Sequence, residues 1–216
     1  MSAKAPQTLR RVALGEVLRA IEARSPLSGV VLQGFDLRGR DLSGLSFSGS
    51  HFINVKLDQA KLLRADLTRT RFVQCSATQA DLSEADLSHA DLQGLDLTSA
   101  RLTKSILLHS RLVRCVLTKA SAEGSTLGKC VLSDCTLDEA CFDSAQWSET
   151  VVIGGSLKRA SFIEATLSKS ALTRLEAEGA SFEQASFSEC VLHDVLLRAA
   201  SFKEDRKSTR LNSSHR

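Results

Sequence analysis

Apolar side chains recur at every fifth position between Leu32 and Phe202. All 35 positions of this series, which we call the centres, are apolar, and nearly all are Leu or Phe. The departures are Ala77, Ala122, Trp147, Val152 and Ala177. A period of five fits neither the 3.6 residues of a helical turn nor the 2.0 of an isolated strand. Each unit is therefore predicted to be a short extended segment closed by a bend.

A second series of small residues lies two positions before the centres. Alanine occupies it at 60, 65, 80, 85, 90, 100, 120, 140, 145, 160, 165, 180, 185 and 200, and Ser, Thr, Cys or Gly occupies many of the others. Alternating large and small inward side chains fill a narrow tube without voids. Late in the chain, Phe142, Phe162, Phe182 and Phe202 replace leucines twenty residues apart, and we interpret them as a stacked core ladder beside Trp147.

The other three positions of each unit are mostly polar and are expected to face water. Five glycines lie where a bend needs a permissive backbone: Gly34, Gly39, Gly44, Gly49 and Gly94. Seven aspartates directly precede a centre, where a short carboxylate accepts hydrogen bonds from backbone N–H groups: Asp36, Asp41, Asp66, Asp81, Asp86, Asp91 and Asp96.

The run Ala-Asp-Leu-Ser-Glu, Ala-Asp-Leu-Ser-His, Ala-Asp-Leu-Gln-Gly at residues 80–94 resembles the pentapeptide-repeat family, and the resemblance covers about residues 30–203. It implies an all-β fold, a right-handed quadrilateral parallel β-helix in which four pentapeptides form one coil of twenty residues. At a coil spacing of about 4.8 Å, the centres would build about 8.75 coils, a rod roughly 40 Å long.

An α-helix is predicted before the repeats, from Thr8 as a possible N-cap to Ala23, and Ser25-Pro26 ends it. A solenoid's first coil exposes its core and needs a lid, so we interpret this helix as a cap. Binding of a membrane surface or a partner is the alternative. The predicted domains are an N-terminal segment with the capping helix at 1–28 and the β-helix at 29–203.

The last residues interrupt the five-residue pattern. Residues 205–215 resemble the translation of a DNA-sequencing adapter, so we interpret 204–216 as a non-native tail and expect native sequence beyond it to be missing. The net charge is +3, but without residues 205–216 the chain has 24 basic and 24 acidic residues. This balance argues against a nucleic-acid partner, which would require clustered Lys and Arg.

Cysteine and histidine give no sign of catalysis or of a cofactor. Five cysteines occupy small inward positions: Cys75, Cys115, Cys130, Cys135 and Cys190. Cys141 should point outward, and Cys115 and Cys135 lie one coil apart, near disulfide distance. Arg69, His89, His109 and Lys129 should stack on successive coils, but two imidazoles without a third ligand seldom hold a metal. No Ser–His or Cys–His arrangement suggests a nucleophile. We therefore predict no enzyme, no cofactor, no metal site and no small-molecule ligand.

Sorting the residues by coil places β-branched side chains on one side of the rod. The candidate partner surface consists of Val73, Val113, Val131, Val151, Ile153 and Val191, and Val31 and Ile53 lie on the same side. An apolar stripe on a rod suggests a contact with a protein partner or a second copy. The alternative is that β-branched residues simply suit stacked strands.

These observations predict a non-enzymatic bacterial rod that acts as a protein-interaction module or scaffold. The resemblance implies an alternative, because some members of the family mimic DNA and bind topoisomerase. Mimicry requires an acidic face, whereas Asp81, Asp86, Asp91 and Asp96 fall on four different sides. A third alternative is the repeat arm of a larger secretion- or membrane-associated protein. With neither a membrane span nor a signal-peptide core in the sequence, a cytoplasmic location is expected.

Overall fold

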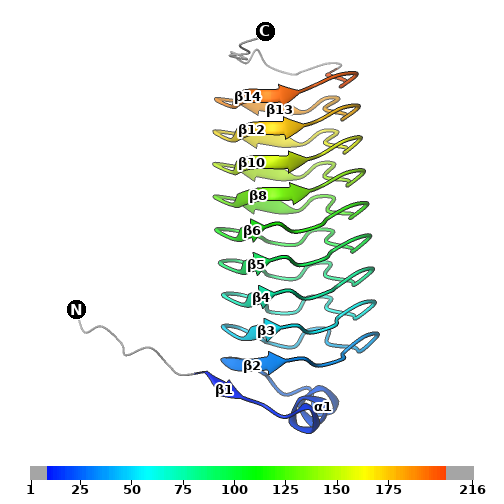
Figure 1. The fold of residues 1–216 in the computed structure, drawn as a ribbon, viewed down its shortest axis with the longest axis vertical. Coiled ribbons are helices and arrows are strands. Elements are labelled where there is room, and N and C mark those ends of the chain that lie inside the picture. Colours follow the sequence, from blue (N-terminus) through cyan, green and yellow to red (C-terminus); the bar gives the residue numbers. More distant parts are fainter. Residues whose placement is uncertain (1–8, 203–216) are drawn as a thin grey trace, which may run out of the picture.

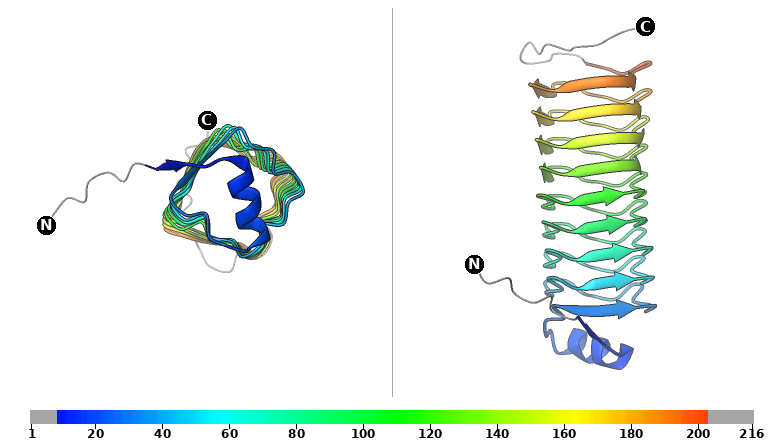
Figure 2. Two further views of the ribbon diagram at one scale, coloured as in Figure 1. Left: turned by 90° about the horizontal axis from the view of Figure 1, so that it is seen from below. Right: turned by 60° about the vertical axis from the view of Figure 1, so that its left-hand side comes forward.

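The computed structural model describes residues 9–202 as one straight stack of coils (Figure 1). The proposed N-cap residue Thr8 and the proposed tail at 204–216 lie outside the described residues. Viewed along its axis, the stack has a four-sided outline (Figure 2). Residues twenty apart pair in parallel throughout, as in Leu32 with Phe52 and Phe52 with Phe72. The predicted quadrilateral parallel β-helix is confirmed.

One side of the rod is a ten-stranded parallel sheet that runs its whole length. In spatial order its strands are β1 (Arg10–Arg11), β2 (Val30–Gln33), β3 (His51–Ile53), β4 (Arg71–Val73), β5 (Asp91–Gln93), β6 (Arg111–Val113), β8 (Val131–Thr136), β10 (Val151–Ser156), β12 (Ala171–Glu176) and β14 (Val191–Leu196). A second parallel sheet covers another side of the C-terminal half only. It consists of β7 (Thr126–Gly128), β9 (Gln146–Ser148), β11 (Thr166–Ser168) and β13 (Ser186–Ser188).

The centres form the core. Every centre from Leu32 to Leu192 is buried, and only the last two, Leu197 and Phe202, are partly exposed. Most of the small residues two positions earlier, such as Ala60 and Ala80, are buried beside them. The predicted phenylalanine ladder is also present, since the rings of Phe142, Phe162 and Phe182 stack at centroid distances of 5.3 and 5.1 Å. The five-residue series therefore predicted which side chains point inward.

A left-handed residue lies two positions after each centre from Leu32 to Leu197. Its φ is close to +50 to +70°, at Gly34 and Gly94 as predicted but also at many larger residues, including Asn54 and Arg64. Because these positions recur in every coil, the bend is imposed by the stacked backbone and not by glycine alone. Gly155 is different, since its φ of +96° falls at an inward position.

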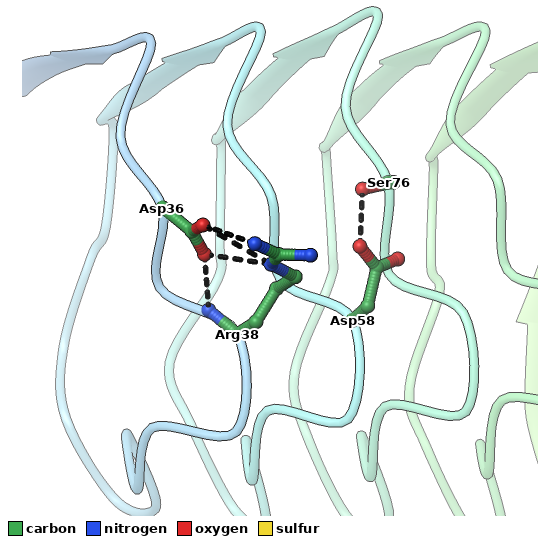
Figure 3. A network of polar contacts seen from close by, with 4 residues as sticks. All are labelled: Asp36, Arg38, Asp58 and Ser76. Atoms are coloured by element: carbon green, nitrogen blue, oxygen red, sulfur yellow. Dashed lines mark hydrogen bonds and ion pairs between the residues drawn. The ribbon is translucent and has the colours of Figure 1, made fainter.

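The predicted hydrogen bonding of the aspartates is confirmed for six of the seven. Asp36, Asp41, Asp66, Asp81, Asp86 and Asp96 each accept a hydrogen bond from the backbone N–H two residues later. Asp58 illustrates a second arrangement, in which the carboxylate accepts hydrogen bonds from Ser76 on the next coil (Figure 3). For Asp91 the prediction was wrong, because this residue begins strand β5 and its carboxylate faces arginines on the neighbouring coils.

The N-terminal helix is shorter than predicted. Helix α1 spans Leu14–Glu22 and follows Ala13, which makes no side-chain capping bond. The predicted start at Thr8 was wrong, because Arg10 and Arg11 pair with Val30 and Val31 as strand β1 instead. The helix lies across the end of the stack (Figure 2). Val17 on this helix is fully buried against the core, as expected of a cap.

Candidate functional site

The ten-stranded sheet presents two rows of outward side chains. The first row is Val31, His51, Arg71, Asp91, Arg111, Val131, Val151, Ala171 and Val191. The second is Gln33, Ile53, Val73, Gln93, Val113, Ser133, Ile153, Thr173 and His193. Strand alternation puts both rows on the outer face, about 4.8 Å apart from coil to coil. The first row therefore carries charge from Arg71 to Arg111 and is apolar from Val131 to Val191, whereas the second row carries no charged residue from Gln33 to Thr173.

The structure brings five of the six candidate partner residues together. Val113, Val131, Val151, Ile153 and Val191 lie on strands β6 to β14, and we call them the valine patch. Val73 is separated from it by strand β5. Val131 and Val191 are 38% and 50% exposed, whereas the other members of the patch are half-buried between their neighbours in the stack. The accessible apolar surface is thus smaller than the sequence suggested. It runs without a break along the first row from Val131 to Val191, through Ala171 of β12, whereas Ser133 separates Val113 from Ile153 in the second row.

Below the patch, the first row carries charge. Asp91 lies between Arg71 and Arg111, with a separation of 3.6 Å to each guanidinium. Both separations exceed hydrogen-bond length, so the single Asp91 carboxylate faces two arginines without a hydrogen bond to either. Burial, and to a smaller degree the charge of Arg71, lowers the pKa of His51 on the next coil. This part of the surface therefore has an excess of positive charge.

A second column of basic side chains lies two residues before the first row, across the corner of the rod. Arg69, His89, His109 and Lys129 are all exposed, and each occupies the left-handed position of its coil. The rings of His89 and His109 are parallel, with centroids 4.8 Å apart and an interplanar angle of 3°. The predicted stack is present. Arg71 and Arg111 lie beside this stack, two residues after Arg69 and His109, where the same twenty-residue sorting of the sequence places them.

The cysteines occupy the positions expected from the series. Cys75, Cys115, Cys130, Cys135 and Cys190 are buried, and all six thiols are free. Contact with the Cys135 thiol and burial raise the pKa of Cys115. Cys141 is half-buried, 3.5 Å from a Glu123 carboxylate oxygen. Burial, together with the carboxylates of Asp143 and Glu123, raises its pKa to about 12. Such thiols are poor nucleophiles near neutral pH.

Residues 9–202 contain neither a metal-binding cluster nor a membrane-spanning helix. No group of three or more His, Cys, Asp and Glu side chains there is arranged to hold a metal ion. Within the same residues, no helix has the length and apolar character needed to cross a bilayer. The predictions that the chain has no metal site and no catalytic residues stay predictions.

Sequence profiles of two related families match the chain. The family described as pentapeptide repeat region matches residues 45–122, and the one described as pentapeptide repeats (8 copies) matches residues 110–151. The chain is a pentapeptide-repeat protein. No curated protein sequence matches it.

Solved structures of other pentapeptide-repeat proteins resemble this one. HetL from the cyanobacterium Nostoc sp. strain PCC 7120, a protein involved in heterocyst differentiation regulation, has a TM-score of 0.52 and 23% identity, covering 89% of this chain and 93% of HetL. QnrB1, a plasmid-mediated fluoroquinolone resistance protein, has a TM-score of 0.38 and 21% identity, covering 81% and 90%. A thylakoid-lumen protein from Arabidopsis thaliana has a TM-score of 0.30 and 27% identity, covering 45% and 68%. The likeness to HetL supports the fold of this pentapeptide-repeat protein.

Proposed function

We propose that this pentapeptide-repeat protein is a non-enzymatic, rigid interaction module that binds a protein partner through the valine patch. The observation that carries the proposal is the unbroken apolar row from Val131 through Val151 and Ala171 to Val191, with Val113 and Ile153 beside it. Apolar side chains that gather on one side of a rod favour contact with another protein. Partner binding also agrees with a scaffold that is stacked in register from end to end, because rigid repeat proteins present extended binding surfaces.

The distribution of charge on the rod argues against DNA mimicry. A mimic needs its carboxylates on one face, but Asp81, Asp86, Asp91 and Asp96 belong to four different sides of the coil. Arginines also stack beside the acidic residues, as in Arg64 with Glu84 at 2.8 Å. The charge pattern therefore favours the interaction module. The six free thiols support the proposal that the protein works in a reducing compartment such as the cytoplasm.

The decisive experiment replaces the patch by residues of similar shape. The variant Val113→Thr, Val131→Thr, Val151→Thr and Ile153→Thr keeps β-branching and replaces four of the five apolar side chains of the patch. A matched control changes exposed or half-buried apolar residues elsewhere: Ile106→Thr, Leu108→Thr, Val116→Thr and Leu196→Thr. Both variants should retain the circular dichroism of the wild type.

Partners would be captured on the wild-type protein from source cells, and self-association would be followed by sedimentation. We expect the patch variant to lose the partner, or the second copy, with at least about a tenfold fall in affinity. The control should bind within about twofold of the wild type, as expected of residues outside the interface. Equal binding by the two variants would contradict the proposed function.

A further inference from the structure

Six residues at one corner of the rod form what we call the basic edge: Arg69, Arg71, His89, His109, Arg111 and Lys129. They come from four successive coils. Elsewhere in the described chain, basic residues stack on acidic ones of the next coil. Examples are Arg64 on Glu84 at 2.8 Å and Lys119 on Glu139 at 3.8 Å. Charge is thus normally balanced along a column.

The basic edge departs from this arrangement. Among the described residues, Arg69, His89 and His109 make no ion pair, and Lys129 reaches Glu149 only at 4.0 Å. Asp91 alone faces Arg71 and Arg111. Arg71 and Arg111 thus share one carboxylate and Arg69 has none within residues 9–202, which leaves positive charge at this corner for an external anion to offset.

Two further acidic residues near the edge, besides Asp91 and Glu149, form no ion pair with it. Asp66 and Asp86 belong to the same side of the rod as Arg69 and His89 and precede them by three residues. Their carboxylates already accept hydrogen bonds from the backbone N–H groups of Thr68 and Ser88. Asp66 also accepts a hydrogen bond from Ser46. These hydrogen bonds already engage both carboxylates.

The geometry points to an acidic, amphipathic α-helix of the partner protein as the ligand of the basic edge. This inference rests on the proposed function, because the edge and the valine patch adjoin. Arg111 of the edge pairs with Val131 of the patch, and Val131 follows Lys129 by two residues. A helix laid along the corner would place the acidic residues of one half on the edge and the apolar residues of its other half on the patch, because the patch follows the edge along the rod axis.

The spacing favours a helix over an extended peptide. The basic groups recur at the coil spacing, as the 4.8 Å between the His89 and His109 rings shows. Side chains at i, i+3, i+7 and i+10 of a helix lie about 4.5, 10.5 and 15 Å along its axis, close to successive coils. Same-face side chains of a strand recur at about 6.7 Å and lose register after one step. A strand could not add here either, because the coils already pair with one another.

Single-stranded nucleic acid fits the edge less well. Such ligands are held by aromatic side chains that stack on the bases. The exposed rings of His89 and His109 already stack on each other. In the described chain, the phenylalanines and Trp147 are buried or half-buried in the core, so no Phe or Trp supplies an exposed platform. A nucleic-acid backbone also has no apolar face to match the valine patch.

The test uses the full chain and two synthetic helical peptides of about 24 residues, long enough to span the edge and the patch. One has Glu at i, i+3, i+7 and i+10 and Leu at i+14, i+17 and i+21, and the other has Gln in place of each Glu. Binding is measured by fluorescence anisotropy at about 50 and about 300 mM NaCl. We expect the Glu peptide to bind, to weaken at the higher salt and to bind at least about tenfold more tightly than the Gln peptide.

Charge reversal supplies the matched variants. Arg69→Glu with Arg111→Glu should weaken binding of the Glu peptide by at least about tenfold. Arg40→Glu with Lys104→Glu changes two exposed cations outside the edge and should change binding by less than about twofold. Circular dichroism confirms that both variants are folded. Equal binding of the two peptides, or an unchanged affinity after reversal at the edge, would overturn the inference.

Two further outcomes separate this inference from the proposed function. A single-stranded oligonucleotide of equal charge that bound more tightly than the Glu peptide would overturn the choice of a helix. If the natural partner were lost by the threonine variant of the valine patch but kept by Arg69→Glu with Arg111→Glu, the proposed function would stand and the acidic helix would be wrong.

Discussion

Gly155 lies so close to Cys135 on the preceding coil that a Cβ atom at position 155 would be 2.0 Å from the Cys135 carbonyl oxygen. The φ of Gly155 is also +96°, which other residues rarely adopt. Gly155 lies in strand β10, which continues through a corner of the rod. Most coils in the N-terminal half form a bend at this corner instead. Close packing of backbone on backbone therefore requires glycine at this position.

Gly155→Ala is expected to destabilise the rod severely. The added methyl group must displace the backbone of a neighbouring coil, and we expect a loss of about 3 kcal/mol or more in the free energy of unfolding. Denaturant unfolding followed by circular dichroism measures it. Gly34→Ala is the control, because Gly34 is also left-handed but nothing lies within 4 Å of the place that an added methyl group would take. It should cost about 1 kcal/mol, and equal losses for the two variants would contradict the role assigned to Cys135.

Phe162→Ala should open a cavity in the C-terminal core. Its ring stacks on Phe142 and Phe182 and meets Trp147 edge-on at 5.4 Å. Removing a buried phenylalanine costs about 3–5 kcal/mol, whereas Phe162→Leu should cost markedly less. Hydrogen exchange should show the loss of protection concentrated in the C-terminal coils, because each coil contacts only its neighbours. A uniform loss along the whole rod would argue against this local coupling.

Acidification should weaken the turns that contain aspartate. Hydrogen bonds and charge from Arg38 lower the pKa of Asp36 to about 2. The pKa of Asp58 is also lowered: its burial acts in the opposite direction, but hydrogen bonds from Thr78 and Ser76 outweigh it. A carboxyl whose pKa is lower in the folded state stabilises folding above its unfolded value near 3.9. This stability is lost as the pH falls from about 4 to about 2.

The measurement is the denaturant midpoint between neutral pH and about pH 2.5. Asp58→Asn and Asp36→Asn should each flatten the fall, since an amide does not titrate in this range. Asp194→Asn is a suitable control, because its carboxylate is exposed and contacts only His193. A control that flattens the curve as much as Asp58→Asn would contradict the assignment.

The thiols should react slowly in the folded protein. Five are buried, and the raised pKa of Cys141, about 12, keeps it protonated at pH 8. We expect little modification by a thiol reagent until denaturant is added, when all six thiols react. Glu123→Gln should speed modification of Cys141, because it removes a negative charge near the sulfur. Rapid labelling of the wild type would show that the site is more open than the structure indicates.

Much of this fold could be predicted from the sequence, because each core position repeats with its own neighbours. A period of five with coils of twenty residues assigns Leu32, Phe52 and Phe72 to one stack without knowledge of any long-range contact. The start of helix α1 was harder to predict. Arg10 and Arg11 are extended only because Val30 and Val31 offer a strand edge, and no local preference of residues 8–13 signals that pairing.

The candidate site could be predicted only in part, for a related reason. Sorting by coil found the residues of the valine patch, but their exposure depends on how far each neighbour covers the next. Val151 is half-buried and Val191 is half exposed, although the sequence treats them alike. The requirement at Gly155 likewise depends on the distance between two backbones, which a residue pattern does not contain.

The in-register stacking of coils also limits how such a chain can change its length. An insertion of twenty residues adds one coil, which lengthens the rod by about 4.8 Å and leaves the stacked columns of side chains aligned. The loss of a single pentapeptide between Lys129 and Val151 would instead turn everything beyond it by a quarter revolution. The basic edge and most of the valine patch would then face different directions, with each coil still well packed. Length variants that keep a shared partner should therefore differ by multiples of twenty residues.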